Sequence, residues 1–207
     1  CLSRSLDCIH TNIGIALAPK SSYSQVIIML KLIGLYVRML RYRVAVMLIM
    51  FFLLGIAFNQ KFTLVSLNYV WAVISLLSSY VAATTINDFA DRKIDNVNHP
   101  FSEGRPLVTG KATTMDLFKI HGMAVFISLV SALLISLPAF IIILVSVAIN
   151  YFYSLEPFKL SYRTFFGPII LTIAYVLLPY LLGLNLVRES FTNSDVYFSS
   201  ALMLLFL

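Results

Sequence analysis

Residues 69–95 read YVWAVISLLSSYVAATTINDFADRKID, an apolar segment that runs directly into a cluster of acidic residues. Tyr69–Ile86 contains no charged residue and approaches the roughly 20 residues that an α-helix needs to cross a bilayer. Asn87, Asp91 and Asp95 follow at positions i, i+4 and i+8, so they share one face if the helix continues. This stretch predicts a membrane-spanning helix that ends at an aqueous boundary lined with carboxylates.

The acidic residues at this boundary predict a metal site. Asp88 lies close to Asp91 in the chain and joins the same patch. Carboxylates this close repel one another unless a cation lies between them. Hard oxygen ligands suit Mg²⁺, which keeps several waters and bridges to substrate phosphates. We therefore predict that Asp88, Asp91 and Asp95 bind Mg²⁺ next to Asn87, and that the ligand is a diphosphate.

The composition is that of a membrane protein. Of the 207 residues, 60% are hydrophobic and 12% are charged, about half the charged fraction of a soluble domain. Further apolar runs are Val44–Phe58, Gly122–Tyr153, Phe165–Val187 and one that begins at Val196. Gly122–Tyr153 is too long for one crossing, and a tight hairpin fits at Leu137-Pro138. We predict an all-α, polytopic membrane helical bundle with about five crossings and the start of a sixth.

The basic residues predict the orientation. Six of the 15 lie in residues 1–43, five in 87–119 and two in 154–164, which leaves Lys61 and Arg188. The positive-inside rule then places the N-terminus and the acidic motif in the cytoplasm. Because topology accounts for the net charge of +6, it gives no reason to expect nucleic acid as a partner.

The first 43 residues are predicted to be a cytoplasmic segment, followed by a membrane domain over residues 44–207. Ser21–Arg43 is amphipathic and is expected to lie on the membrane surface, where its cations contact lipid headgroups. Cys1 and Cys8 are expected to be simple thiols. Because the last residues are still apolar, we expect the chain to be the N-terminal part of a longer protein.

Two loops on the predicted cytoplasmic side supply cations for a diphosphate. The loop after the acidic motif contains Arg105 and Lys111, and a second turn, Tyr153–Arg163, adds Lys159 and Arg163. A guanidinium binds phosphate oxygens in a bidentate manner, whereas a lysine supplies a point charge. Carboxylates and cations around one pocket would hold Mg²⁺ and diphosphate together.

Three segments taken together resemble the UbiA-type membrane prenyltransferases. They are NDFADRKID (residues 87–95), GRPLVTGKAT (104–113) and YSLEPFKL (153–160), and the resemblance extends over roughly Arg38–Leu207. It implies nine crossings around a central cavity and two Asp-rich motifs, of which Asn87, Asp91 and Asp95 resemble the first. The second would lie beyond Leu207. The chain departs from the family at Ser161, where many members have a basic residue.

The resemblance also implies a reaction. Mg²⁺ on the carboxylates would neutralise an isoprenyl diphosphate donor, and the allylic cation formed by ionisation would alkylate an aromatic or lipid acceptor, as in quinone or prenyl-lipid biosynthesis. The implied catalytic residues are Asp91, Asp95, Tyr153 and Lys159, and the implied diphosphate ligands are Asn87, Arg105, Lys111 and Arg163. Arg41 resembles the acceptor-side arginine. The π faces of Tyr151 and Tyr153 are expected to stabilise the cation.

Other interpretations stay open. A membrane lipid phosphotransferase also uses an Asp-rich Mg²⁺ site, although its D-G-x-x-A-R pattern is absent from this chain. A transporter usually needs ionisable residues at mid-bilayer, and the apolar runs contain none. An inactive remnant is the third alternative. Asn150 and Asn185, both in apolar runs, are interpreted as interhelical hydrogen-bonding residues.

Overall fold

The computed structural model describes residues 20–57, 66–102, 104–188 and 192–207, and every regular element within them is helical. Residues 1–34 and 35–207 form two separate units, and all of the predicted site residues belong to the second. The expectations for Cys1, Cys8 and Lys61 fall outside the described residues. The predicted domain boundary after residue 43 stays a prediction.

Several helices are long and apolar enough to cross a membrane. Four qualify individually, and a bent pair of helices supplies a fifth if the pair forms one span. The four are α3 (Leu67–Ala90), α5 (Thr114–Leu133), α6 (Leu137–Ser154) and the run of α7 (Phe166–Thr172), η2 (Ile173–Leu177) and α8 (Leu178–Asn185). The bent pair is α1 (Lys20–Met39) and α2 (Tyr42–Ala57), and α9 (Asn193–Phe206) follows α8. This arrangement confirms the predicted all-α bundle of an integral membrane protein.

The hairpin predicted near Leu137-Pro138 connects α5 to α6. α5 ends at Leu133, and the Ser136 hydroxyl accepts a hydrogen bond from the Ala139 N–H at 3.2 Å, which caps α6. Pro138 lies in the first turn of α6. The N–H groups of the first turn do not bond to a carbonyl within the helix, so the N–H that proline lacks is not needed there. The chain therefore turns where the sequence predicts.

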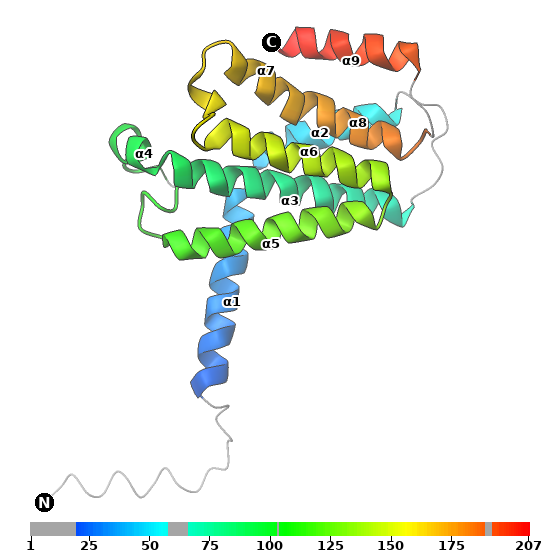
Figure 1. The fold of residues 1–207 in the computed structure, drawn as a ribbon. Coiled ribbons are helices and arrows are strands. Elements are labelled where there is room, and N and C mark those ends of the chain that lie inside the picture. Colours follow the sequence, from blue (N-terminus) through cyan, green and yellow to red (C-terminus); the bar gives the residue numbers. More distant parts are fainter. Residues whose placement is uncertain (1–19, 58–65, 103, 189–191) are drawn as a thin grey trace, which may run out of the picture. The chain divides into compact units, whose positions relative to one another are not determined.

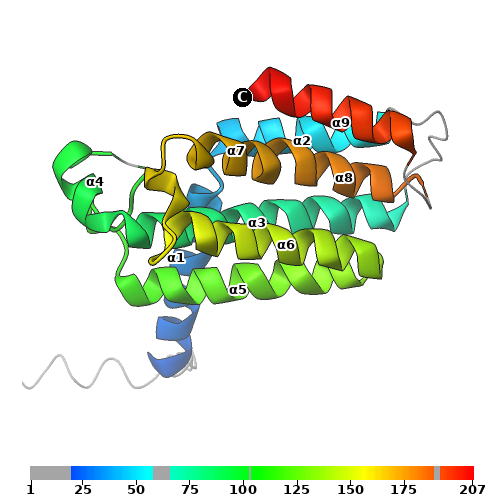
Figure 2. The same ribbon diagram turned by 45° about the horizontal axis from the view of Figure 1, so that its top comes forward.

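α3 is the central helix and carries the acidic motif at its C-terminal end. It packs most extensively against α5 and also against α6, and the three run side by side (Figures 1 and 2). Its buried positions are mostly small residues, which allow helix backbones to approach closely in a membrane. The Ser75 hydroxyl donates to the Ser128 carbonyl of α5 at 2.8 Å. These contacts fix the position from which the motif emerges.

α2 lies against α8 through a reciprocal glycine contact. A Cβ on Gly55 would collide with the Tyr180 carbonyl, and a Cβ on Gly183 would collide with the Phe52 carbonyl. Only glycine leaves room for two backbones at this separation.

The span from α7 to α8 is interrupted by η2, a single π-helical turn. The Leu178 N–H bonds to the Ile173 carbonyl, five residues earlier. Pro179 follows directly, lacks an N–H and crowds the carbonyl of Tyr175, four residues before it. A wider turn relieves that clash, and such turns are frequent at functional sites.

Candidate active site

The acidic motif spans the junction between α3 and a short helix, α4 (Arg92–Asn98). The Asp91 N–H bonds to the Asn87 carbonyl and the Asp95 N–H to the Asp91 carbonyl, both at 2.9 Å. Helical hydrogen bonding therefore continues through the junction, and the i, i+4 relation is preserved. The Asn87 amide donates to an Asp91 carboxylate oxygen at 3.4 Å.

Each of the three motif carboxylates is paired with a cation from a different segment. The pairs are Arg41–Asp88 at 2.6 Å, Lys159–Asp91 at 3.6 Å and Arg105–Asp95. Within the described part of the chain, no group of three acidic, histidine or cysteine side chains is arranged to hold a metal. In this structure the carboxylates are neutralised by these cations and do not converge on one point.

The two cations Arg41 and Lys159 share an unusual backbone conformation. Their φ angles are 32° and 36°, and they are the two non-glycine residues with positive φ among those the structure describes. Such a conformation costs energy and persists where the surroundings enforce it, commonly at functional sites. Arg41 lies at the break between α1 and α2, and Lys159 lies just before η1 (Leu160–Tyr162). Both side chains are therefore aimed at the motif by constrained turns.

Tyr162 is a further contact of Asp91 that the sequence analysis did not include in the site. Its hydroxyl donates to Asp91 Oδ1 at 3.0 Å, and the Lys159 ammonium lies 4.3 Å from the centre of its ring. Desolvation and the neighbouring Asp91 carboxylate raise the pKa of Tyr162, so the phenol stays protonated and remains a donor. Tyr162 therefore occupies one of the two carboxylate oxygens that Asp91 can offer to a metal.

Tyr162→Phe is expected to tighten metal binding at Asp91, because the variant no longer has a hydroxyl that competes for Oδ1. The ring is about half exposed, so we expect a modest change, a roughly threefold lower Mn²⁺ concentration at half-saturation. The measurement is a Mn²⁺ titration followed by electron paramagnetic resonance. Tyr197→Phe, at an exposed tyrosine of α9, is the matched control. Weaker Mn²⁺ binding by Tyr162→Phe would contradict the competition and make the phenol a metal-supporting group.

A cavity of about 220 Å³ lies beside the motif. Its lining comes from α3, α6, α7 and η2, together with Arg41 and Val44. The residues that these four elements contribute include Asn87, Asn150, Tyr153 and Tyr175. Arg41, Asn87 and Tyr153 therefore share one space, and their roles toward a donor and an acceptor stay predictions. Tyr151 is directed elsewhere, since its hydroxyl lies 2.6 Å from His121 Nε2 on α5.

The oxygens near this cavity are suited to Mg²⁺. Asn87 Oδ1 and Asp88 Oδ2 are buried acceptor atoms for which no described residue provides a hydrogen-bond donor. Buried acceptors normally have partners, so two neighbouring ones without any indicate a ligand. Both are hard oxygen donors, as Mg²⁺ prefers. The residues present therefore fit the predicted metal in their chemistry, and Asn87 lines the cavity.

Two further predicted diphosphate ligands are Arg163 and Lys111. Arg163 donates to the Phe158 carbonyl within its own loop at 3.4 Å. Lys111 is exposed in the turn before α5. Their role stays a prediction.

The two membrane asparagines, which the sequence treats alike, differ in the structure. Asn185 accepts a hydrogen bond from the Ser136 hydroxyl at 2.9 Å, which confirms the predicted interhelical contact. Asn150 makes no such bond with any described residue and lines the cavity instead, so the same interpretation is wrong for Asn150. One signal was available: Asn150 precedes Tyr153 by one helical turn, so the two share a face of α6.

The chain is similar to known proteins of one family. Residues 46–207 match the model of the UbiA prenyltransferase family. No curated protein matches the chain. Similar solved structures include a UbiA homologue from Archaeoglobus fulgidus bound to GPP and Mg²⁺ (TM-score 0.70, 21% identity) and the same homologue bound to DMAPP and Mg²⁺ (TM-score 0.69, 21% identity). The alignments cover 83% and 82% of this chain, respectively, and 59% of that homologue's chain in both cases.

Proposed function

The chain belongs to the UbiA prenyltransferase family, and we propose that it transfers the prenyl group of an isoprenyl diphosphate to an aromatic or lipid acceptor. The observation that carries this proposal is one arrangement: three carboxylates, three cations and a largely apolar cavity meet at the end of a membrane helix. The solved relatives bind DMAPP or GPP together with Mg²⁺, which supports the same ligand class here. The motif side is proposed to be cytoplasmic.

In this proposal, Asn87, Asp88, Asp91 and Asp95 would hold Mg²⁺, which would supply the positive charge that offsets the diphosphate. Arg41, Arg105 and Lys159 then exchange their carboxylate partners for diphosphate oxygens, where they stabilise the charge on the leaving group. The allylic C–O bond breaks and both electrons leave with the diphosphate. An acceptor ring carbon forms the new C–C bond to the allylic carbon and then loses its proton.

The cavity provides the environment that such a cation requires. Tyr80, Tyr153 and Tyr175 line it, and an aromatic face stabilises a cation that lies over it. The remaining lining is mostly apolar, which limits access of water to the cation and favours alkylation over hydrolysis.

Removal of the metal tests the proposed donor site. Wild-type protein in lipid nanodiscs is titrated with GPP and with geranylgeranyl diphosphate, first with Mg²⁺ and then with EDTA. We expect saturable binding with Mg²⁺ and at least a roughly 100-fold weaker affinity in EDTA, since the three cations alone would then have to offset the charge of both the carboxylates and the diphosphate. If no isoprenyl diphosphate of any length binds with Mg²⁺ present, the prenyltransferase proposal fails.

A further inference from the structure

A second pocket, of about 310 Å³, lies beside the acidic motif and differs in chemistry from the 220 Å³ cavity. The described residues that line it are Arg41, His99, Ser102, Gly104 and Arg105. None of them has an acidic or an apolar side chain, whereas the cavity is lined mostly by apolar and aromatic residues of the membrane helices. A lining of cations and small polar groups suits a small anion that carries no apolar group.

Successive turns of the loop after α4 place three of these side chains together. The Ser102 N–H bonds to the His99 carbonyl at 3.1 Å, and the Arg105 N–H bonds to the Ser102 carbonyl at 3.0 Å. Side chains three residues apart lie above one another in turns of this kind, so His99, Ser102 and Arg105 point to one side of the loop. The loop continues directly from α4, because the His99 N–H bonds to the Asp95 carbonyl at 2.8 Å.

The side chains of this pocket have hydrogen-bond donors to spare. Arg41 uses Nη2 for Asp88, at 2.6 Å, and for the Gly104 carbonyl, at 3.5 Å, and Arg105 uses Nη1 for Asp95. No described residue bonds to the other guanidinium nitrogens, to the His99 ring or to the Ser102 hydroxyl. Guanidinium, imidazole and hydroxyl groups all donate to phosphate oxygens. The lining therefore has the composition of a phosphate-binding site.

Arg41 connects this pocket to the cavity. Among the described residues it is the one that lines both spaces. Its guanidinium contacts Asp88 of the motif and the Gly104 carbonyl of the pocket. A diphosphate held by Arg41 at the motif is therefore adjacent to a second set of donors, which it reaches while Arg41 stays bound to it.

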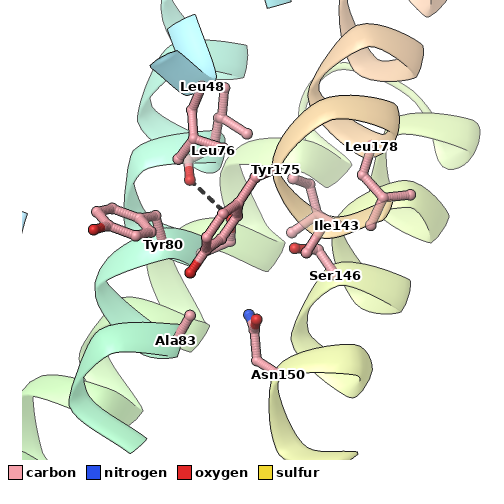
Figure 3. A pocket seen from close by; sticks show the side chains of 11 residues that line it. Leu48, Leu76, Tyr80, Ala83, Ile143, Ser146, Asn150, Tyr175 and Leu178 are labelled. Atoms are coloured by element: carbon pink, nitrogen blue, oxygen red, sulfur yellow. Dashed lines mark hydrogen bonds between the residues drawn. The ribbon is translucent and has the colours of Figure 1, made fainter. Parts of the chain in front are cut away.

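The membrane interior offers no comparable place for a free diphosphate. Figure 3 shows a deeper space within the helices, around which Leu48, Leu76, Ile143 and Leu178 lie. The described residues that line this space include no cation, and an uncompensated anion is costly in such surroundings. The prenyl chain of a donor has the opposite requirement, because it needs the apolar lining that the 310 Å³ pocket lacks.

We propose that the 310 Å³ pocket binds the free diphosphate that prenyl transfer leaves behind, and so forms a release site on the far side of Arg41 from the cavity. This inference rests on the proposed function and adds His99 and Ser102 as residues that bind the product and not the donor. Because no carboxylate is among the described lining residues, the pocket accepts the anion without a metal. The proposed donor site differs, since its carboxylates require Mg²⁺.

The test is a titration with pyrophosphate in EDTA, with the protein in phosphatidylcholine nanodiscs and empty nanodiscs as the blank. We expect saturable binding to wild-type protein, at least about 10-fold tighter than that of inorganic phosphate, because two guanidinium groups from separate segments can hold one phosphoryl group each. GPP in EDTA is expected to bind no more tightly than pyrophosphate, since its prenyl chain finds no apolar side chain in this pocket.

The double variant His99→Ala with Ser102→Ala removes two donors of the pocket and keeps both arginines. It is expected to bind pyrophosphate in EDTA about 10-fold more weakly than wild type. Its Mg²⁺-dependent affinity for GPP is expected to be unchanged, because neither residue lines the cavity. Ser200→Ala, at an exposed serine of α9, is the control and is expected to bind both ligands as wild type does.

Three results would overturn the inference. They are no binding of pyrophosphate to wild-type protein in EDTA, wild-type affinity in the double variant, and equal affinities for phosphate and pyrophosphate. Equal losses of pyrophosphate and of Mg²⁺-dependent GPP binding in a folded double variant would also overturn it, because the pocket would then be part of the donor site. If GPP binds with Mg²⁺ while pyrophosphate fails in EDTA, the release site alone falls. If no isoprenyl diphosphate binds with Mg²⁺, the proposed function falls, and the release role falls with it.

Discussion

Asp91→Asn is expected to abolish Mg²⁺-dependent binding of GPP, with at least about a 100-fold loss of affinity. Asp91 lies at the junction of α3 and α4 and contacts Asn87, Lys159 and Tyr162, so the carboxylate is the common point of the site. The amide keeps the shape and removes the negative charge that a divalent cation requires. The measurement is a GPP titration with and without Mg²⁺.

The substitution is expected to leave the helical fold intact, because Asp91 follows the last residue of α3 and has no place in the apolar core. Glu156→Gln is the matched control, since Glu156 is an exposed acid in the same loop as Lys159 and is expected to bind GPP as wild type does. Asp95→Asn should behave like Asp91→Asn. Mg²⁺-dependent GPP affinity that remained at the wild-type level in both aspartate variants would contradict the assignment of the metal site.

Gly183→Ala is expected to give a large loss of stability, at least about 2 kcal/mol of unfolding free energy. The new Cβ would collide with the Phe52 carbonyl and lie 3.2 Å from the Ile56 nitrogen. Both are backbone atoms of α2, so no side chain can rotate away, and the two helices must separate. Gly55→Ala should have a similar effect, because its Cβ meets the Tyr180 carbonyl of α8.

The measurement is thermal unfolding in detergent, followed by circular dichroism and by the loss of monodisperse protein on size exclusion. Gly122→Ala on α5 is the control, since no atom lies within 4 Å of its Cβ. That variant is expected to be more stable by up to about 1 kcal/mol, because alanine favours the helix. Equal melting temperatures for Gly183→Ala and Gly122→Ala would show that α2 and α8 are not held at this distance.

The sequence predicted the spanning helices well, because they depend on local patterns, and the acidic motif lies at the end of one of them. Apolar runs mark helices, and a proline after Leu137 marks a hairpin. The sequence could not predict which charges pair. Arg41 contacts Asp88, which is 47 positions away in the chain. Which of Arg38, Arg41 and Arg43 makes this contact depends on the left-handed backbone conformation of Arg41. Spacing alone cannot show which cation a folded turn directs inward.

The predicted three-carboxylate cluster and the two asparagines show the same limit. Sequence spacing predicts that Asp88, Asp91 and Asp95 lie near one another, yet each carboxylate turns toward its own cation. Asn150 and Asn185 have the same residue type in similar apolar surroundings. They differ because Ser136 lies opposite Asn185, whereas a hollow space lies opposite Asn150. That difference arises from helix packing, which periodicity does not specify.

The order of the paired residues along the chain has a consequence for synthesis. Arg41 is made before its partner Asp88, and Arg105 follows Asp95 within ten positions, so these two carboxylates find their counter-ions early. Asp91 must wait for Lys159 and Tyr162, which are synthesised only after α5 and α6. Until then Asp91 lacks both of these partners. A nascent chain therefore acquires a charge-balanced motif only when the hairpin of α5 and α6 is complete, which links the maturation of the site to membrane insertion.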